Sequence, residues 1–225
     1  MGKNERIDKS ANIFKSISEP DAHHYDQKFK YLPNWLDNTS YFYQKEANSN
    51  LPRRYYYYRR GTVIRVNFGT NLGSEFSNIH FAIVLDKKDS PKKKTLTVLP
   101  LTSKQCSNRF SLGQEVFNQT VTILDAQMKN LKDRINMIKR ILDQGSKPSD
   151  EDYNSFLRDF EDLKKVVGTY KAYDKNSYVR LSDITTISKL RIERINKYDP
   201  SGKIRLSSQQ MALISHELMK LYLSK

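Results

Sequence analysis

The sequence predicts an α+β protein: a small β-barrel with an N-terminal helical extension, an inserted antiparallel helical hairpin and a C-terminal helix. Two observations predict this fold class. Short β-branched segments separated by polar turns occupy residues 61–103, and similar segments return at 177–195. Between them, apolar residues of 121–168 recur at alternating intervals of four and three, the period of a helix. We divide the chain into the extension (1–58), the first part of the barrel (59–120), the hairpin (121–168) and the rest of the barrel with the last helix (169–225).

The N-terminal extension carries short apolar helical patterns that Pro20 and Pro33 interrupt. We expect one or two short helices followed by a connector. The connector leads into the run RRYYYYRR at residues 53–60. Aromatic rings stack on bases and arginines hold phosphates, so this run fits RNA binding. Alternating tyrosines on an edge strand would give the same pattern, and both interpretations stay open.

Three strands are predicted after the extension. Residues 62–68 are β-branched, 79–85 form an apolar run interrupted only by His80, and 95–101 return after a turn rich in lysine. Pro100 indicates an edge or a bulge in the third of these strands, because proline cannot donate a hydrogen bond to a ladder. This pattern is typical of a small barrel.

The register of the second and third strands decides where His80 lies. A hairpin that pairs Leu85 with Thr97 sets His80 directly opposite Thr102. Directly opposed residues share a face of the sheet, with Cβ atoms about 4.5–5.5 Å apart. A slip of one residue would put the two side chains on opposite faces.

The helical hairpin is predicted from two apolar seams with a stop between them. Gly145 and Pro148 end the first helix, and Ser149 with Asp152 resembles a capping box that begins the second. A short loop between two long helices predicts an antiparallel pair, although two ordinary amphipathic helices on the main core would show the same spacing. The seam residues are Leu124, Met128, Leu131, Ile135, Ile138 and Leu142, then Tyr153, Phe156, Phe160, Leu163 and Val167.

The last part of the chain returns to strand and then to helix. Residues 178–181 and 184–188 have strand composition. Ser207 or Ser208 caps the last helix. Its apolar face holds Met211, Ile214, Leu218 and Leu221.

The composition favours a polyanionic partner. Lys and Arg number 39 against 25 Asp and Glu, a net charge of +14, so RNA, DNA or an acidic protein tail are the partners to expect. The single cysteine, Cys106, rules out an intramolecular disulfide framework and a Cys-rich zinc module. The four histidines, His23, His24, His80 and His216, have no ligand spacing, so we expect no metal and no cofactor. With no signal-peptide pattern and no long apolar stretch, we expect a cytoplasmic chain without a membrane partner.

An ordered series of short motifs resembles a known family. The motifs are Arg60-Gly61-Thr62-Val63, Phe68, Gly73-Ser74-Glu75, Val98-Leu99-Pro100-Leu101-Thr102-Ser103 and Val179-Arg180-Leu181-Ser182-Asp183-Ile184-Thr185-Thr186-Ile187. In this order they resemble the MazF/PemK toxins of bacterial toxin–antitoxin pairs. The resemblance covers about residues 59–103 and 177–192, and leaves 1–58 and 121–168 outside it.

The resemblance implies an SH3-like β-barrel homodimer. It also implies a metal-independent endoribonuclease that cuts single-stranded mRNA at short sequences and leaves a 2′,3′-cyclic phosphate and a 5′-hydroxyl. A cognate acidic antitoxin would restrain it and bind DNA with it. One departure matters: many members carry an active-site Arg-Pro where this chain has His80-Phe81.

The candidate catalytic residues are His80, Thr102 and Glu75. Histidine can act as acid or base near neutral pH, whereas arginine mainly stabilises charge, so the departure changes the division of labour. Thr102 would hydrogen-bond the scissile phosphate, and Glu75 would orient His80, act as acid or base, or cap its loop. The candidate RNA contacts are Arg59, Arg60, Asn71, Ser74, Ser103, Lys104 and Arg109.

Three other interpretations compete with this one. His80 could be a partly buried histidine satisfied by a backbone carbonyl. The barrel could bind nucleic acid without cutting it. It could also be a toxin like CcdB, a relative of the barrel that acts on DNA gyrase, although the positive charge favours nucleic acid.

Overall fold

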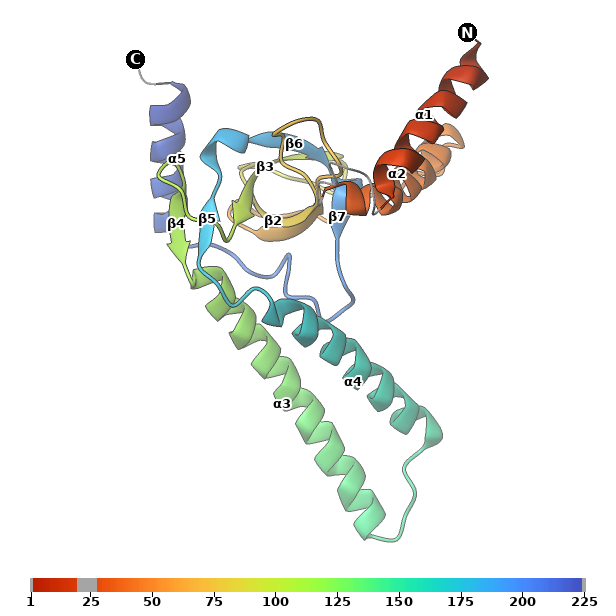
Figure 1. Ribbon diagram of the computed structural model, residues 1–225. Helices are drawn as coiled ribbons and strands as arrows, with labels where there is room; N and C mark the ends of the chain where they lie inside the picture. Colours follow the sequence, from red (N-terminus) through yellow and green to blue (C-terminus); the bar gives the residue numbers. More distant parts are fainter. Residues whose placement is uncertain (1, 20–27, 224–225) are drawn as a thin grey trace.

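The computed structural model describes residues 2–19 and 28–223, and over these it is an α+β protein (Figure 1). The predicted break at Pro20 and the pair His23-His24 lie outside the described residues. The α-helices are α1 (Lys3–Ser18), α2 (Leu32–Ala47), α3 (Glu115–Asp143), α4 (Asp150–Lys171) and α5 (Ser208–Tyr222). The strands are β1 (Val63–Asn67), β2 (Ile79–Val84), β3 (Thr95–Thr102), β4 (Phe110–Gly113), β5 (Ser177–Val179), β6 (Thr185–Ser188) and β7 (Ile192–Glu193). Short 3-10 turns cover Phe29–Tyr31, Leu181–Asp183 and Lys189–Arg191.

The seven strands form one antiparallel sheet that does not close into a barrel. Its order is β4-β5-β3-β2-β1-β7, with β6 beside the first half of β3. Within the described chain, the outermost strands β4 and β7 pair only with β5 and β1. β7 has two residues and α3 begins directly after β4, so neither end is long enough to complete a ring of hydrogen bonds. The predicted α+β class is confirmed, but the predicted small β-barrel is not, because the sheet stays open.

The predicted register of the second and third strands is confirmed. Ala82 pairs with Pro100, Ile83 with Leu99 and Val84 with Val98. The ladder stops there, two residues short of the predicted pair, because the end of β3 turns to β5 instead. Of the two alternatives at Pro100, the edge was wrong, since β3 pairs with β2 on one side and with β5 and β6 on the other. A bulge against β2 was wrong too, because Ala82 and Pro100 pair in a regular register. Pro100 still serves the sheet through its carbonyl, which accepts from the Arg180 N–H at 3.0 Å.

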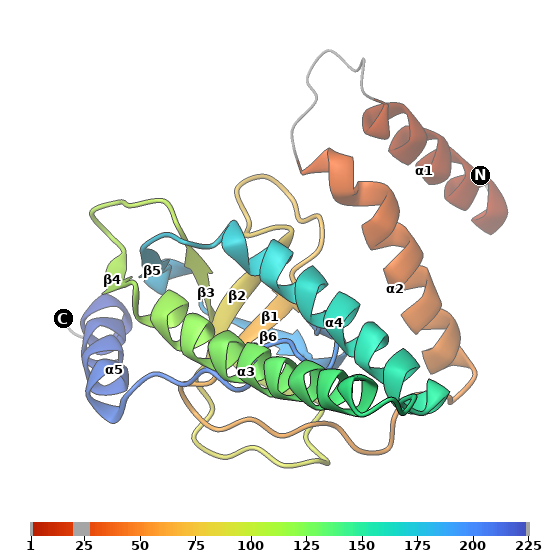
Figure 2. The same ribbon diagram turned by 90° about the horizontal axis from the view of Figure 1, so that it is seen from below.

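The two faces of the sheet carry separate apolar cores. Alternate residues of β1, such as Ile64 and Val66, join one core with β6. Val63 and Ile83 face the other core, which includes residues of α3, α4 and α5. Figure 2, seen from below, shows α3 and α4 side by side in front of the strands. The helical insertion therefore covers part of one face and forms part of the walls around the start of β2.

The hairpin is an antiparallel pair whose seam is only half covered. The Ser149 hydroxyl caps α4 by accepting from the Asp152 N–H at 3.1 Å, as predicted. Leu131 and Leu163 are buried, but Met128 and Phe160 are 50% and 48% exposed. α3 also begins six residues before the predicted boundary of 121, because its first turns pack on the main core. Both alternatives thus hold in part, since the helices pack on each other and on the core.

The N-terminal helix α2 docks on the sheet through Trp35. Its indole lies so close to Gly69 that an added Cβ would sit 2.6 Å from the ring, and Gly69 has a φ of +88° that only glycine adopts easily. The Arg191 guanidinium lies over the same indole, 5.0 Å from the ring centre. This contact holds the extension against the loop between β1 and β2.

The tyrosine-rich run is a connector, not an edge strand. The Tyr55 N–H donates to the Pro91 carbonyl at 2.9 Å, and the Tyr58 N–H donates to the Asp89 carboxylate at 2.8 Å. The run therefore lies along the turn between β2 and β3. Tyr56 and Tyr57 remain 74% and 58% exposed, so the RNA-binding interpretation stays a prediction. None of the described helices combines the length and apolarity that crossing a membrane requires.

Candidate functional site

His80 lies near the start of β2, opposite Val66 of β1. Its half-buried ring packs against Phe76, with the ring centres 4.5 Å apart. Phe76 comes from the loop between β1 and β2 and packs edge-on against Phe68, which belongs to the core. The imidazole is thus held by packing and not by a backbone carbonyl among the described residues.

The surroundings of His80 favour its neutral form. Burial, and after it the charge of Arg180, lower the pKa of the imidazole from 6.5 to about 4. A neutral imidazole at pH 7 has a free lone pair and can accept a proton. The neutral form is the one that a base requires, whereas an acid requires the protonated form.

Arg180, which was not among the candidate residues, contributes its charge to the surroundings of His80. It directly follows β5, and its guanidinium lies 4.8 Å from the centre of the Phe76 ring that also contacts His80. Its Nε pairs with the Asp183 carboxylate at 2.5 Å, which fixes the side chain. The segment around Arg180 belongs to the motif series. Only the order of the strands in the sheet shows that Arg180 lies beside the loop that carries Phe76.

His80 and Thr102 line one cavity of about 220 Å³, which we call the Thr102 cavity. Ser103 and Lys104 also line it, so four of the predicted residues meet there. The Thr102 hydroxyl accepts from the Lys104 N–H at 3.2 Å. The remaining walls include Val116, Phe117 and Thr120 of α3, Tyr170 of α4, and Ala172 and Tyr173 directly after α4.

The other candidate residues of the loop between β1 and β2 and of the loop after β3 do not line the Thr102 cavity. Glu75 and Ser74 are exposed, and neither is among the described residues that line the cavity. The Asn71 side chain donates to the carbonyls of Phe68 and Phe76, at 3.1 and 2.7 Å, so it shapes the loop between β1 and β2. Arg109 donates to the Lys104 carbonyl at 2.6 Å and supports the loop after β3.

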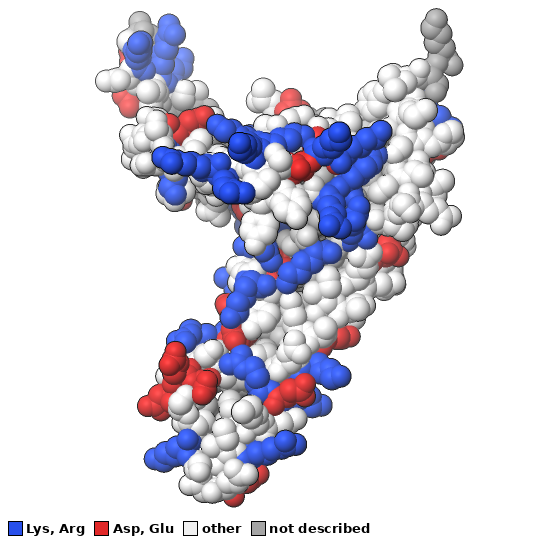
Figure 3. Space-filling view, turned by 180° about the vertical axis from the view of Figure 1, so that it is seen from behind, with Lys and Arg blue, Asp and Glu red and all other residues white. Residues whose placement is uncertain are grey.

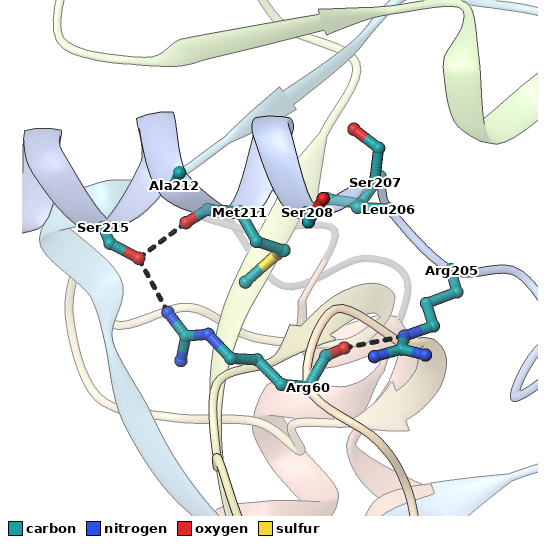
Figure 4. Close-up of a pocket in the computed structure, with 8 residues that line it drawn as sticks. All are labelled: Arg60, Arg205, Leu206, Ser207, Ser208, Met211, Ala212 and Ser215. Carbon is teal, nitrogen blue, oxygen red and sulfur yellow. Dashed lines mark hydrogen bonds between the residues drawn. The ribbon is translucent and has the colours of Figure 1, made fainter.

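Arg59 and Arg60 are far from His80. The Arg60 side chain donates to the carbonyl of Leu85 and to the Ser215 hydroxyl, so it joins the far end of β2 to α5. Five residues of extended chain separate Leu85 from His80, roughly 16 Å. Figure 4 shows Arg60 in a different pocket, with Arg205 and the first turns of α5. Arg59 is exposed next to it.

No protein-family model matches the chain. No curated protein matches it either. Any functional conclusion therefore depends on the geometry around His80 and Thr102. No group of three or more His, Cys, Asp or Glu side chains in the described part of the chain could hold a metal ion.

Basic side chains gather on one face of the molecule. In Figure 3, Lys and Arg form a band across the sheet region between the N-terminal helices and α5, and further basic residues mixed with acidic ones follow the hairpin. Such a band attracts polyanions.

The lowered pKa of His80 predicts acid sensitivity of the fold. Between pH 6.5 and about 4, His80 is protonated in the unfolded chain but stays neutral in the folded protein. The unfolding free energy therefore falls as the pH falls. The loss is up to about 1.4 kcal/mol per pH unit in this window, and this group has no effect above it. Urea unfolding of wild type and His80→Gln at about pH 7.5, 5.5 and 4.5 measures it. A stability difference between the two proteins that is independent of pH would contradict the prediction.

Proposed function

We propose that the chain is a PemK/MazF-like toxin with an SH3-like sheet, which cuts single-stranded RNA without a metal ion. The observation that carries the proposal is that His80 and Thr102 line one cavity, where burial and the charge of Arg180 lower the pKa of His80. Many members of the family that the sequence resembles have an arginine at the position of His80. Here Arg180 brings a guanidinium to the neighbourhood of His80 from another element.

The proposed reaction is an attack of the RNA on itself. His80 takes the proton of the 2′-hydroxyl, whose oxygen then forms a bond to the adjacent phosphorus. The bond from phosphorus to the 5′-oxygen breaks, and that oxygen leaves with a proton from water. A 2′,3′-cyclic phosphate and a 5′-hydroxyl result. Donors that line the cavity, from Thr102 and Lys104, stabilise the extra charge on the phosphorane. We give the exposed Glu75 no step in the chemistry.

The proposed partners follow from the charge and the family resemblance. The net charge of +14 and the basic band support single-stranded mRNA as substrate and a small acidic antitoxin as inhibitor. The resemblance adds a homodimer.

The proposed chemistry predicts a distinctive product. Purified protein with a long single-stranded RNA in EDTA should give discrete fragments whose 3′ ends carry a cyclic phosphate. A single 2′-deoxy substitution at a mapped cleavage site should abolish the cut at that site, because the nucleophile is gone. Gel electrophoresis and mass spectrometry of the fragments measure both effects.

A neighbouring cleavage site in the same RNA is the control for the 2′-deoxy substitution. It should still be cut at the unmodified rate. Cleavage that survives the deoxy substitution, or fragments that end in a 3′-hydroxyl, would exclude this mechanism. A folded protein that cuts none of several RNAs would favour the non-catalytic or gyrase-directed interpretation.

A further inference from the structure

A second cavity lies next to His80, on the side of the N-terminal helices. Its volume is about 370 Å³, within the range of small-molecule sites, and we call it the Trp35 cavity. Ile79, His80 and Tyr173 line both this cavity and the Thr102 cavity. Its outer wall comes from Tyr31, Asn34 and Trp35, which lie outside the segments that resemble the toxin family. The extension therefore adds a site beside the proposed catalytic base.

Three residues of its wall carry polar atoms without partners. Arg65 Nε, Thr70 Oγ1 and Asn78 Oδ1 are shielded from solvent and have no hydrogen-bond partner among the described residues. Leaving such an atom unpaired is unfavourable, so native proteins rarely keep buried polar atoms without a partner. All three residues line one cavity, so a small rotation of their side chains would bring these atoms to a ligand in that cavity.

The charge of the wall excludes a phosphate as the best ligand. Glu193 pairs with the Arg65 guanidinium at 3.4 Å and accepts from the Asn67 amide at 2.9 Å, so the one positive charge is already compensated. The unpaired atoms are an N–H donor, a hydroxyl and a carbonyl acceptor. A phosphate offers only acceptors and negative charge. A neutral ring with both donors and acceptors on its edge matches the set.

The aromatic wall suits a planar ring. Tyr31 and Tyr173 are 46% and 37% exposed, so each has free ring surface. Trp35 is fixed between Gly69 and Arg191 and gives the wall a rigid position. Unpaired bases of single-stranded RNA are recognised by aromatic stacking together with hydrogen bonds to their edges.

We propose that the Trp35 cavity binds one unstacked nucleobase of single-stranded RNA, adjacent to the phosphate held at His80 and Thr102. This inference rests on the proposed function. In it, the Trp35 cavity sets the sequence preference of RNA cleavage. The base next to the cleaved phosphate enters between Tyr31 and Tyr173, and its edge pairs with Arg65, Thr70 and Asn78.

Binding to RNA that cannot be cleaved tests this inference separately from catalysis. The probes are four fluorescein-labelled octamers, each of one base, with 2′-fluoro in place of every 2′-hydroxyl. Their affinities are measured by anisotropy in EDTA. Wild type should prefer one base. Thr70→Val should weaken that preference about 2- to 10-fold, the value of one hydrogen bond. Tyr31→Ala should weaken binding of the preferred base roughly 5- to 100-fold.

Thr39→Val is the matched control. Its hydroxyl lies on α2 and is also buried without a partner among the described residues, but Thr39 does not line the cavity. This variant should bind like wild type. If Thr70→Val and Tyr31→Ala also bind like wild type while wild type cuts RNA, the proposed base pocket is refuted and the proposed ribonuclease activity is supported. If base preference depends on Thr70 but no RNA is cut, the proposed ribonuclease activity is refuted and the proposed base pocket is supported. A folded wild type that binds none of the four probes overturns the pocket, and RNA cleavage then decides the ribonuclease by itself.

Discussion

His80→Ala is expected to slow RNA cleavage by roughly 100- to 10 000-fold, because the proton of the 2′-hydroxyl then has no positioned base. The side chain is half-buried and lines both cavities of the site. Its neutral form at pH 7 is what the proposed attack requires. The rate of fragment formation from a single end-labelled RNA, under single-turnover conditions, measures the loss.

The control for this substitution is His216→Ala. His216 lies exposed on α5, outside both cavities, so its loss should leave the rate unchanged. RNA binding should persist in His80→Ala, since Thr102, Lys104 and the basic band remain. If cleavage and binding disappear together in a folded variant, His80 is a binding residue and the acid–base assignment fails. An unchanged cleavage rate would exclude His80 from the mechanism.

Local rules were enough to predict much of the fold. Ser149 and Ser207 cap helices because their hydroxyls accept from backbone N–H groups three residues on, a pattern visible in the sequence. The register of β2 against β3 followed from a turn of fixed length and two apolar runs, and it placed His80 and Thr102 around one cavity. These features depend on neighbours along the chain or on a single strand pair.

Features that depend on distant segments were not predictable in this way. β4 and β7 are too short and too mixed in composition to stand out, so the open ends of the sheet were missed. Arg180 lies near His80 because β5 pairs with the end of β3. These two strands are separated in the sequence by the whole helical hairpin, so their pairing cannot be read from local spacing. The contact of Trp35 with Gly69 joins the extension to the loop between β1 and β2, and no spacing rule links the two. Glu75 belonged to a motif, yet its loop turns the side chain to solvent.

The largest expected loss of stability comes from a buried ion pair beside the tyrosine-rich connector. Lys189 Nζ lies 2.7 Å from both Asp89 oxygens, and the two side chains are 2% and 0% exposed. The same ammonium donates to the carbonyls of Tyr56 and Ser90, at 2.9 and 3.1 Å. Asp89 also accepts from the Tyr58 N–H. One pair therefore joins the connector, the turn between β2 and β3, and the segment between β6 and β7.

Asp89→Ala should lower the unfolding free energy by about 3–5 kcal/mol, because it leaves the Lys189 ammonium buried without a counter-charge. Urea unfolding followed by circular dichroism measures the change. Lys93→Ala is the control: Lys93 pairs with Asp86 in the same turn, but its side chain is 36% exposed, and exposed pairs contribute about 0–1 kcal/mol. The double variant Asp89→Leu with Lys189→Met should recover much of the loss, since no buried charge is left. A single Asp89→Ala that costs no more than Lys93→Ala would show that the pair does not hold the three segments together.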